Sequence, residues 1–272
     1  MPELPEVETT LRGIEPYLRR ATIRDIVVRN GSLRWPVPEQ ALRELIGQPI
    51  TQVHRRAKYI LLQTPAGTIL LHLGMSGSLR VLSSGQDPGR HDHLDIIVSG
   101  QRTVRLNDPR RFGCCLLLKE PVFSHTLLAK LGPEPISDAF HGDVLFDCSR
   151  GRTIAIKTLI MDAKVVVGVG NIYASEALFL AGIRPTLAAK RISRKRSHAL
   201  ANAIKTVLGK AIKAGGTTLQ DFTRVDGKPG YFRHELQVYG RAGECCTICG
   251  CPIKSQRVGQ RNSFYCPQCQ TF

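Results

Sequence analysis

The chain has 272 residues, and its 38 Lys and Arg residues against 22 Asp and Glu residues give a formal net charge of +16. This length suffices for one large domain or two ordinary ones, and the positive charge favours a polyanionic partner, nucleic acid before membrane. Three glutamates among the first eight residues argue against a signal peptide, and polar residues interrupt the longest apolar stretch, so no membrane span is expected. Nine cysteines, an odd number, fit the reducing cytoplasm better than a disulfide framework.

The chain opens Met-Pro-Glu-Leu-Pro-Glu-Val-Glu. A small residue such as Pro2 normally allows removal of the initiator methionine, which leaves a secondary amine that can attack an electrophilic carbon and form an iminium. Pro5 suits the first turn of a helix, and apolar residues follow at helical spacing through residues 7–18. Glu3 and Glu6 then lie on roughly one face, beside the amine. The simpler alternative is that these glutamates only complement the helix dipole.

After this helix, β-branched and apolar segments predict strands over residues 21–29, 50–63, 68–82, 93–98 and 102–106. The turn signals at residues 65–67 and 99–101 predict two hairpins. This half of the chain is predicted to be an antiparallel sandwich with the first helix packed against it. The composition changes near residues 131–135, where we place a domain boundary.

Several residues in this half of the chain are candidates for function. Lys58 stands in an apolar strand, and its simplest interpretation is a side chain that extends to the rim. Met75 and Phe112 are most simply core residues, yet turn residues that hold an apolar wedge beside the paired Arg110 and Arg111 also suit a protein that unstacks DNA. The His91-Asp92-His93 segment could offer a metal pair, but no third ligand is suggested nearby, so no metal site is expected there.

The second half has a helical pattern near residues 153–162, 172–180 and 192–213. Gly168 and Gly170 do not form a dinucleotide motif, because Tyr173 stands where the third glycine is required. Asn171 is predicted to be a helix N-cap, and the backbone amides before it could bind a phosphate. Residues 215–235 are predicted to form a long polar loop.

The four cysteines near the end have the spacing of a zinc ribbon. Two Cys-x-x-Cys pairs are separated by sixteen residues, which predicts one structural Zn²⁺ held by Cys246, Cys249, Cys266 and Cys269. Two further thiols, Cys245 and Cys251, leave the register of this ligand set open. The hairpin between the pairs carries Lys254, Arg257 and Arg261, which suits contact with phosphate.

The opening string, the Asn-Asp-Pro-Arg-Arg-Phe-Gly loop, the Gly-Val-Gly-Asn turn and the zinc ribbon together resemble the formamidopyrimidine-DNA glycosylase family, and the resemblance runs from end to end. It implies that Pro2 attacks the sugar C1′, with Glu3 as proton donor and Glu6 in a supporting role. Lys58 is implied to contact a backbone phosphate and to serve the elimination steps. Arg261 is implied to reach the lesion phosphates and to act in the final elimination.

The resemblance also implies a set of DNA-binding residues, namely Met75, His91, Arg110, Phe112, Arg152, Lys157 and Asn171. Three of them, Met75, Arg110 and Phe112, would fill the void left by an everted nucleotide. Arg152 stands where the family often has lysine, so the charge is kept but the hydrogen-bonding geometry differs. The loop at residues 215–235 would close over the flipped base.

The expected fold is α+β: an antiparallel β-sandwich catalytic domain at residues 1–132, a helix-two-turn-helix DNA-binding domain at residues 133–238, and a four-cysteine zinc finger at residues 239–272. The expected protein is a monomeric cytoplasmic glycosylase and lyase that removes oxidised purines by β,δ-elimination from double-stranded DNA, with abasic sites as further substrates. The alternatives are an endonuclease VIII-like enzyme for oxidised pyrimidines and a non-catalytic, zinc-containing nucleic-acid-binding protein. Leu4 and the wedge residues favour the purine enzyme.

Overall fold

The computed structural model describes residues 2–83, 85–119, 121–217 and 235–272. The described residues form two compact units. The first contains residues 2–129 and 214–217, and the second contains residues 130–213 and 235–272. Within the described ranges, no helix is long and apolar enough to cross a membrane.

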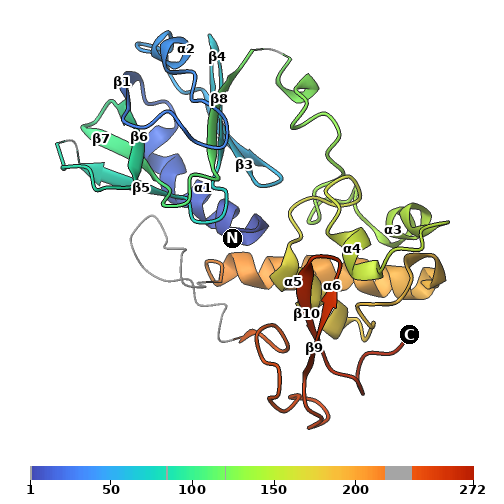
Figure 1. Cartoon of the computed structure of the whole chain (residues 1–272). Helices are drawn as coiled ribbons and strands as arrows, with labels where there is room; N and C mark the ends of the chain where they lie inside the picture. Colours follow the sequence, from blue (N-terminus) through green and yellow to red (C-terminus); the bar gives the residue numbers. More distant parts are fainter. Residues whose placement is uncertain (1, 84, 120, 218–234) are drawn as a thin grey trace. The chain divides into compact units, whose positions relative to one another are not determined.

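Two four-stranded antiparallel sheets and a long helix make up the first unit (Figure 1). One sheet has the order β1 (Ile23–Val28), β6 (Asp92–Val98), β7 (Arg102–Asn107) and β5 (Ser78–Ser83). The other has the order β2 (Gln52–Arg56), β3 (Tyr59–Thr64), β4 (Gly67–His72) and β8 (Cys114–Leu118). The helix is α1 (Leu4–Leu18), and the short α2 (Glu39–Arg43) and a 3-10 turn at Val122–Ser124 complete the unit.

One hydrophobic core joins the two sheets and α1. Ile14 and Leu18 of α1 pack in the same cluster as Ile60 of one sheet and Leu94 of the other, and all four are buried. This arrangement follows from the alternation of apolar residues along the strands and their helical spacing in α1. The predicted sandwich with a flanking helix is confirmed.

Two of the predicted strands are wrong in their extent. The segment at residues 50–63 is divided by a tight turn at Ala57 and Lys58, where Ala57 has a φ of +55° and Arg56 pairs with Tyr59. The segment at residues 68–82 is divided by a loop at residues 73–77. Lys58 therefore lies at the end of a hairpin and not inside a strand, which leaves its side chain outside the sheet ladder.

Strand β8 places two thiols in the interior of this unit. Cys114 and Cys115 are both free and buried. Burial raises the pKa of Cys114 to about 11 and also raises the pKa of Cys115, because a thiolate is poorly stabilised away from water.

The second unit is built from helices and one small hairpin (Figure 1). Its elements are α3 (Gly142–Ser149), α4 (Ile156–Ile160), α5 (Asn171–Leu180), a 3-10 turn at Ala189–Arg191, α6 (Arg194–Lys213), β9 (Lys254–Val258) and β10 (Arg261–Tyr265). Helix α5 contacts α4, α6 and β10, and its residues 172–179 are all buried. The predicted helical domain with a terminal hairpin is confirmed, with α5 at its centre.

The start of α5 differs from the prediction by one residue. Gly170, with extended backbone angles, is the N-cap, and Asn171 is the first helical residue. A glycine at this position leaves the first amides of the helix uncovered by a capping side chain. The side chain of Asn171 is thereby available for contacts with other elements.

A buried carboxylate on α5 holds the segment that leads into the cysteine module. Glu176 accepts hydrogen bonds from the backbone N–H groups of Gln237, Val238 and Tyr239, at 2.9, 3.0 and 2.8 Å. Burial raises the pKa of Glu176, although these three hydrogen bonds oppose the shift. Phe179 of α5 lies in one apolar cluster with residues of the cysteine module, namely Val238, Cys246, Ile253 and Cys266.

Candidate functional site

The first turn of α1 gathers the residues expected to carry the chemistry. The Glu6 carboxylate accepts a hydrogen bond from the N–H of Glu3 at 2.8 Å and another from the N–H of Thr217 at 2.8 Å. Glu3 and Glu6 are each only 2% exposed. Glu6 therefore fixes the backbone beside Pro2 and ties it to the chain at Thr217.

The backbone at residue 216 is adapted to this contact. Gly216 has a φ of +82°, and a Cβ at this position would lie 3.1 Å from a Glu6 carboxylate oxygen. A glycine thus allows the chain to approach the carboxylate closely. Pro2, the predicted nucleophile, therefore lies beside two buried carboxylates, an arrangement that suits amine attack assisted by proton transfer.

Lys58 lies near a histidine that the sequence did not single out. Burial, together with the positive charges of Lys58 and Arg34, lowers the pKa of His72 to about 4. The Nδ1 atom of His72 accepts a hydrogen bond from the N–H of Gly74 at 3.0 Å, so the neutral ring carries its proton on Nε2. His72 ends β4 after the continuous apolar run Ile69-Leu70-Leu71, and only its place before the Leu-Gly-Met loop could have marked it.

Met75, Arg110 and Phe112 lie together, as the sequence predicted. With Arg34 and His72 they line a cavity of about 750 Å³, whose remaining lining residues are Ser32, Leu33, Gly74 and Arg111. Met75 is 36% exposed and Phe112 is 51% exposed. These two side chains are therefore surface residues and not part of the core. Exposed apolar groups beside cationic groups suit insertion into a base stack.

A buried aspartate joins the two loops that carry this cluster. The carboxylate of Asp108 accepts hydrogen bonds from the hydroxyl of Ser76 at 2.7 Å and from the N–H of Gly113 at 2.8 Å. The N–H of Arg110 in turn donates to the Ser76 hydroxyl at 3.1 Å. Asp108 is fully buried, so this one side chain fixes both loops relative to each other.

The two loops also approach each other at their backbones. Gly74 has a φ of +62°, and a Cβ there would lie 2.4 Å from both the Gly113 nitrogen and the Phe112 carbonyl carbon. No side chain fits at that distance. Glycine at position 74 is what allows Met75 and Phe112 to be presented side by side.

His91 directly precedes β6, next to Asp108. Its carbonyl accepts the N–H of Asp108 at 3.0 Å, and its ring lies edge-on to that of His93, with centroids 6.5 Å apart. The Nε2 atom of His93 is 2.9 Å from the carbonyl oxygen of Asp108. Among the described residues, only the four cysteines are grouped closely enough to hold a metal ion.

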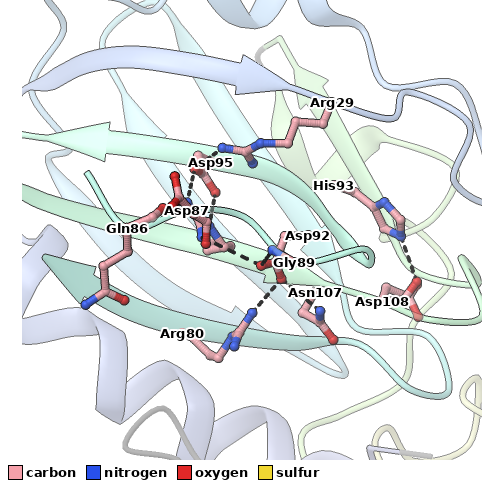
Figure 2. Close-up of polar contacts among 11 residues, drawn as sticks. Arg29, Arg80, Gln86, Asp87, Gly89, Asp92, His93, Asp95, Asn107 and Asp108 are labelled. Atoms are coloured by element: carbon pink, nitrogen blue, oxygen red, sulfur yellow. Dashed lines mark hydrogen bonds and ion pairs between the residues drawn. The ribbon is translucent and has the colours of Figure 1, made fainter. Parts of the chain in front are cut away.

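An arginine–aspartate network holds the backbone before His91 (Figure 2). Arg105 donates two hydrogen bonds of 2.8 Å to Asp95, and it also donates to the carbonyls of Gln86 and Asp87 at 2.9 and 3.0 Å. Arg105 is 4% exposed and Asp95 is 2% exposed. Buried, multiply hydrogen-bonded pairs of this kind specify one conformation.

Asp92 extends this network toward β5 and β7 (Figure 2). It accepts hydrogen bonds from Arg80 at 2.5 Å, from the side chain of Asn107 at 2.8 Å and from the N–H of Gly89 at 2.8 Å. Burial opposes ionisation, but these hydrogen bonds and the Arg80 charge lower the pKa of Asp92 overall. The segment that leads to His91 is thus fixed at its backbone by charged groups of the sheet.

In the second unit, Lys157 and Asn171, two of the expected DNA-binding residues, contact each other. The ammonium of Lys157 donates to Asn171 Oδ1 at 2.7 Å, to Ser263 Oγ at 2.7 Å and to the carbonyl of Asn262 at 3.3 Å. Asn171 donates to the same carbonyl at 3.1 Å. Lys157 is 1% exposed, so it joins α4, α5 and β10 internally.

Arg261 and Arg152 are more accessible. Arg261 begins β10, directly before Asn262, and is exposed. The hydrogen bonds to Asn262 therefore place Arg261 close to Asn171. Arg152 is also exposed, in the turn before α4. The loop predicted at residues 215–235 lies largely outside the described residues, which resume at residue 235.

The four predicted cysteine ligands converge. Their sulfur atoms all lie within 4.8 Å of one another, with Cys246 and Cys269 at 3.9 Å and Cys249 and Cys266 at 3.4 Å. The N–H groups of Ile248 and Cys269 point at the sulfurs of Cys246 and Cys266. Such N–H groups stabilise thiolates, so the residues present fit a four-thiolate metal ion. Cys245 and Cys251 are not part of this cluster.

Comparison with known proteins gives matches over nearly the whole chain. Two family models match: the formamidopyrimidine-DNA glycosylase N-terminal domain over residues 1–115, and the formamidopyrimidine-DNA glycosylase H2TH domain over residues 131–223. A curated formamidopyrimidine-DNA glycosylase of Magnetococcus marinus is 57% identical over 273 residues, covering 99% of each chain.

Two solved structures of Lactococcus lactis Fpg also match. A mutant of that protein, in complex with DNA containing Fapy-dG, has a TM-score of 0.92 and 32% identity and covers 100% of both chains. A complex with DNA containing an abasic site has a TM-score of 0.91 and 32% identity, and it covers 99% of this chain and 100% of the other.

Proposed function

Because this chain belongs to the formamidopyrimidine-DNA glycosylase family, we propose that it cleaves damaged DNA through a covalent intermediate on the nitrogen of Pro2. The chain is a base-excision DNA glycosylase for oxidised purines, and AP lyase activity is characteristic of its family. The match to these relatives favours the purine enzyme over both the endonuclease VIII-like and the non-catalytic alternatives. The observation that carries the proposed mechanism is the Glu6 carboxylate, which fixes the backbone at Glu3 beside Pro2.

The proposed reaction begins after removal of Met1. The lone pair of the Pro2 nitrogen attacks C1′ of the everted nucleotide, the glycosidic bond breaks, and the damaged base leaves with the bonding electrons and takes up a proton. The nitrogen loses its own proton, and opening of the sugar ring gives an iminium as Glu3 protonates the ring oxygen.

The iminium acidifies the C2′ proton. Loss of that proton breaks the bond from C3′ to its phosphate, and a second elimination breaks the bond from C5′ to its phosphate. Water then hydrolyses the remaining iminium and restores the Pro2 amine. Lys58 and Arg261 are proposed to assist these eliminations by binding the phosphates that leave, since both carry a positive charge.

The other predicted residues are proposed to hold the DNA. Met75, Arg110 and Phe112 would fill the gap in the duplex, because two exposed apolar side chains and a guanidinium are presented together there. His91, Arg152 and Asn171 are proposed to contact the backbone. Lys157 is proposed to act there chiefly by positioning Asn171, since its own ammonium is buried.

Three further assignments belong to this proposal. The metal held by the four cysteines is proposed to be one structural Zn²⁺, which tetrahedral thiolate sites prefer. The chain is proposed to act as a monomer in the cytoplasm, where its free thiols remain reduced. Its partner is double-stranded DNA that contains oxidised purines or abasic sites, as found with its structural relatives.

Borohydride trapping tests the covalent step. The wild-type protein, incubated with a duplex that carries 8-oxoguanine opposite cytosine, is expected to give an adduct that maps to the N-terminal peptide. Pro2→Gly retains a terminal amine and should trap less. Pro2→Leu should retain Met1, which displaces the amine, and should lose at least about 100-fold in trapping rate. Intact mass checks the state of Met1, and an adduct on an internal lysine would refute the mechanism.

A further inference from the structure

Positive charge is concentrated in one part of the second unit. Residues 177–213 contain nine Lys and Arg residues and no Asp or Glu. Five cations from this region and the neighbouring turn form what we call the basic patch: Arg150, Lys190, Arg191, Arg194 and Lys195. All five are exposed.

Backbone contacts bring the segments of the basic patch together. The N–H of Lys190 donates to the carbonyl of Arg152 at 2.8 Å, and the N–H of Ala189 donates to the carbonyl of Ile154 at 2.8 Å. The guanidinium of Arg150 donates to the carbonyl of Ile192 at 2.8 Å. The patch is therefore continuous with Arg152, which is already proposed to contact DNA.

Two guanidinium groups of the basic patch share one aromatic ring. Arg150 and Arg194 lie over the ring of Phe146, with their Cζ atoms 4.0 and 4.4 Å from its centroid. Within the described residues, Asp143 is the only carboxylate paired with a member of the patch, through Arg194. Like charges held this close repel each other, and one carboxylate offsets only part of that repulsion.

The position of these cations is also unfavourable for helix α6. The first turn of α6 contains basic residues and no acidic residue. Cations at the positive end of a helix typically cost about 0.3–1 kcal/mol each at low ionic strength. Folding stability therefore does not account for this arrangement, and residues that break a local rule are expected at functional surfaces.

We propose that the basic patch binds the phosphate backbone of duplex DNA beyond the lesion contacts and thereby holds the enzyme on undamaged DNA. This rests on the proposed DNA-binding function. Charge complementarity favours a polyphosphate partner, because guanidinium and ammonium groups in water gain from the release of counterions. The aromatic ring of Phe146 is already covered by the two arginines, so it is not presented as an apolar anchor for a protein partner.

The triple variant K190Q/R191Q/K195Q tests this proposal, since it leaves Arg150 and Arg194 on Phe146. Binding of the full-length protein to an undamaged 30-base-pair duplex is measured by fluorescence anisotropy over a range of salt concentrations. Each lost phosphate contact should reduce the slope of log affinity against log salt by about 0.9, so a reduction of up to about 2.7 is expected. The control R19Q/R24Q/R43Q removes the same charge from exposed positions of the first unit.

The outcomes separate this proposal from the enzymatic one. Cleavage of a saturating lesion duplex at low salt should stay within about twofold of wild type in the triple variant, because catalysis does not use the patch. An equal reduction of the slope in both variants would show an effect of net charge and overturn the proposal. A loss confined to single-stranded RNA would also overturn it. Failure of the wild-type protein to cut lesion DNA would contradict the proposed function alone.

Discussion

Glu6 is proposed to position the nucleophile by binding backbone amides. Its contribution to the reaction rate can therefore be measured separately from that of Glu3, the proposed proton donor. Its carboxylate serves the N–H groups of Glu3 and Thr217 at once. A glutamine has only one carbonyl oxygen for these two donors, and its amide group would face one of them. Leaving a buried donor unsatisfied costs about 1–3 kcal/mol.

We therefore expect Glu6→Gln to lower the rate of borohydride trapping by about 10- to 100-fold, which corresponds to that free energy. Affinity for DNA with an abasic-site analogue should change little, because Glu6 is buried and acts on the position of the nucleophile. Glu15→Gln, on the same helix but paired with the exposed Arg19, is the control. If affinity and trapping rate fell in parallel, Glu6 would have a general structural role instead.

His72 gives a pH dependence of stability with a definite sign. Its folded pKa of about 4 lies below the usual histidine value, so the unfolded chain binds the proton first as the pH falls. The contribution of the neutral ring is complete above about pH 6.5 and is lost between there and pH 4, amounting to about 3 kcal/mol.

Urea unfolding at pH 7.5 and pH 4.5 should show this loss in the wild-type protein and a smaller loss in His72→Asn. An asparagine oxygen can still accept the N–H of Gly74, so the variant removes the titration while keeping that contact. An equal loss of unfolding free energy in both proteins would show that His72 is not the group responsible.

At the scale of single residues, the sequence indicated which side chains to consider but did not show what surrounds each of them in the fold. Met75 and Phe112 were named as wedge candidates, and their exposure agrees with that role. His72 was missed because its strand reads as ordinary sheet and its neighbours, Lys58 and Arg34, come from distant positions. No local sequence pattern shows that His72 lies near the charges of Lys58 and Arg34, because these residues are far apart in the chain.

At the scale of elements, the two wedge loops depend on one close backbone approach. An alanine at position 74 would bring its Cβ to 2.4 Å from the backbone of Phe112 and Gly113, so one loop must move. The control is Gly47→Ala, where φ is also positive, at +88°, and no atom lies within 4 Å. Both variants carry backbone strain, and only the first adds a clash.

Gly74→Ala is accordingly expected to weaken binding to DNA with an abasic site and to cost at least about 2 kcal/mol more than the control, by the usual cost of overpacking. Anisotropy and urea unfolding measure the two effects. Wild-type affinity in Gly74→Ala would mean that the close approach of the loops does not matter for DNA binding.

The sequence predicted most helices and hairpins of the fold but misplaced several boundaries, two of which have a clear cause. The turn at Ala57 and Lys58 contains no glycine, asparagine or proline, so the apolar pattern appeared to run through it. The N-cap of α5 was predicted at Asn171 because asparagine is a strong N-cap, whereas Gly170 is the N-cap and Asn171 is the first helical residue. In both places tertiary packing overrides local preference.

At the scale of the whole molecule, one proposed metal ion joins the two Cys-x-x-Cys segments of the cysteine module, and the module packs against α5. Cys266→Ser should reduce the bound zinc from one ion per chain to less than about 0.2, because three thiolates bind zinc much more weakly than four. It should also weaken DNA binding, since Lys157 and Asn171 both contact residues of β10.

Elemental analysis after gel filtration measures the zinc content, and Cys251→Ser is the matched control because its sulfur lies outside the cluster. That control should retain a full complement of metal. If Cys251→Ser lost as much zinc as Cys266→Ser, the assigned register of the four ligands would be wrong.

The buried thiols of β8 affect how well such an enzyme resists oxidation under the conditions that damage DNA. Oxidised purines arise where reactive oxygen species are abundant, and those species attack thiolates far faster than thiols. With a pKa of about 11, only about one Cys114 side chain in 10,000 is ionised at pH 7. Cys115 is fully buried and still less acidic. The interior of the first unit thus keeps its sulfur in the form most resistant to the oxidants that create the substrate.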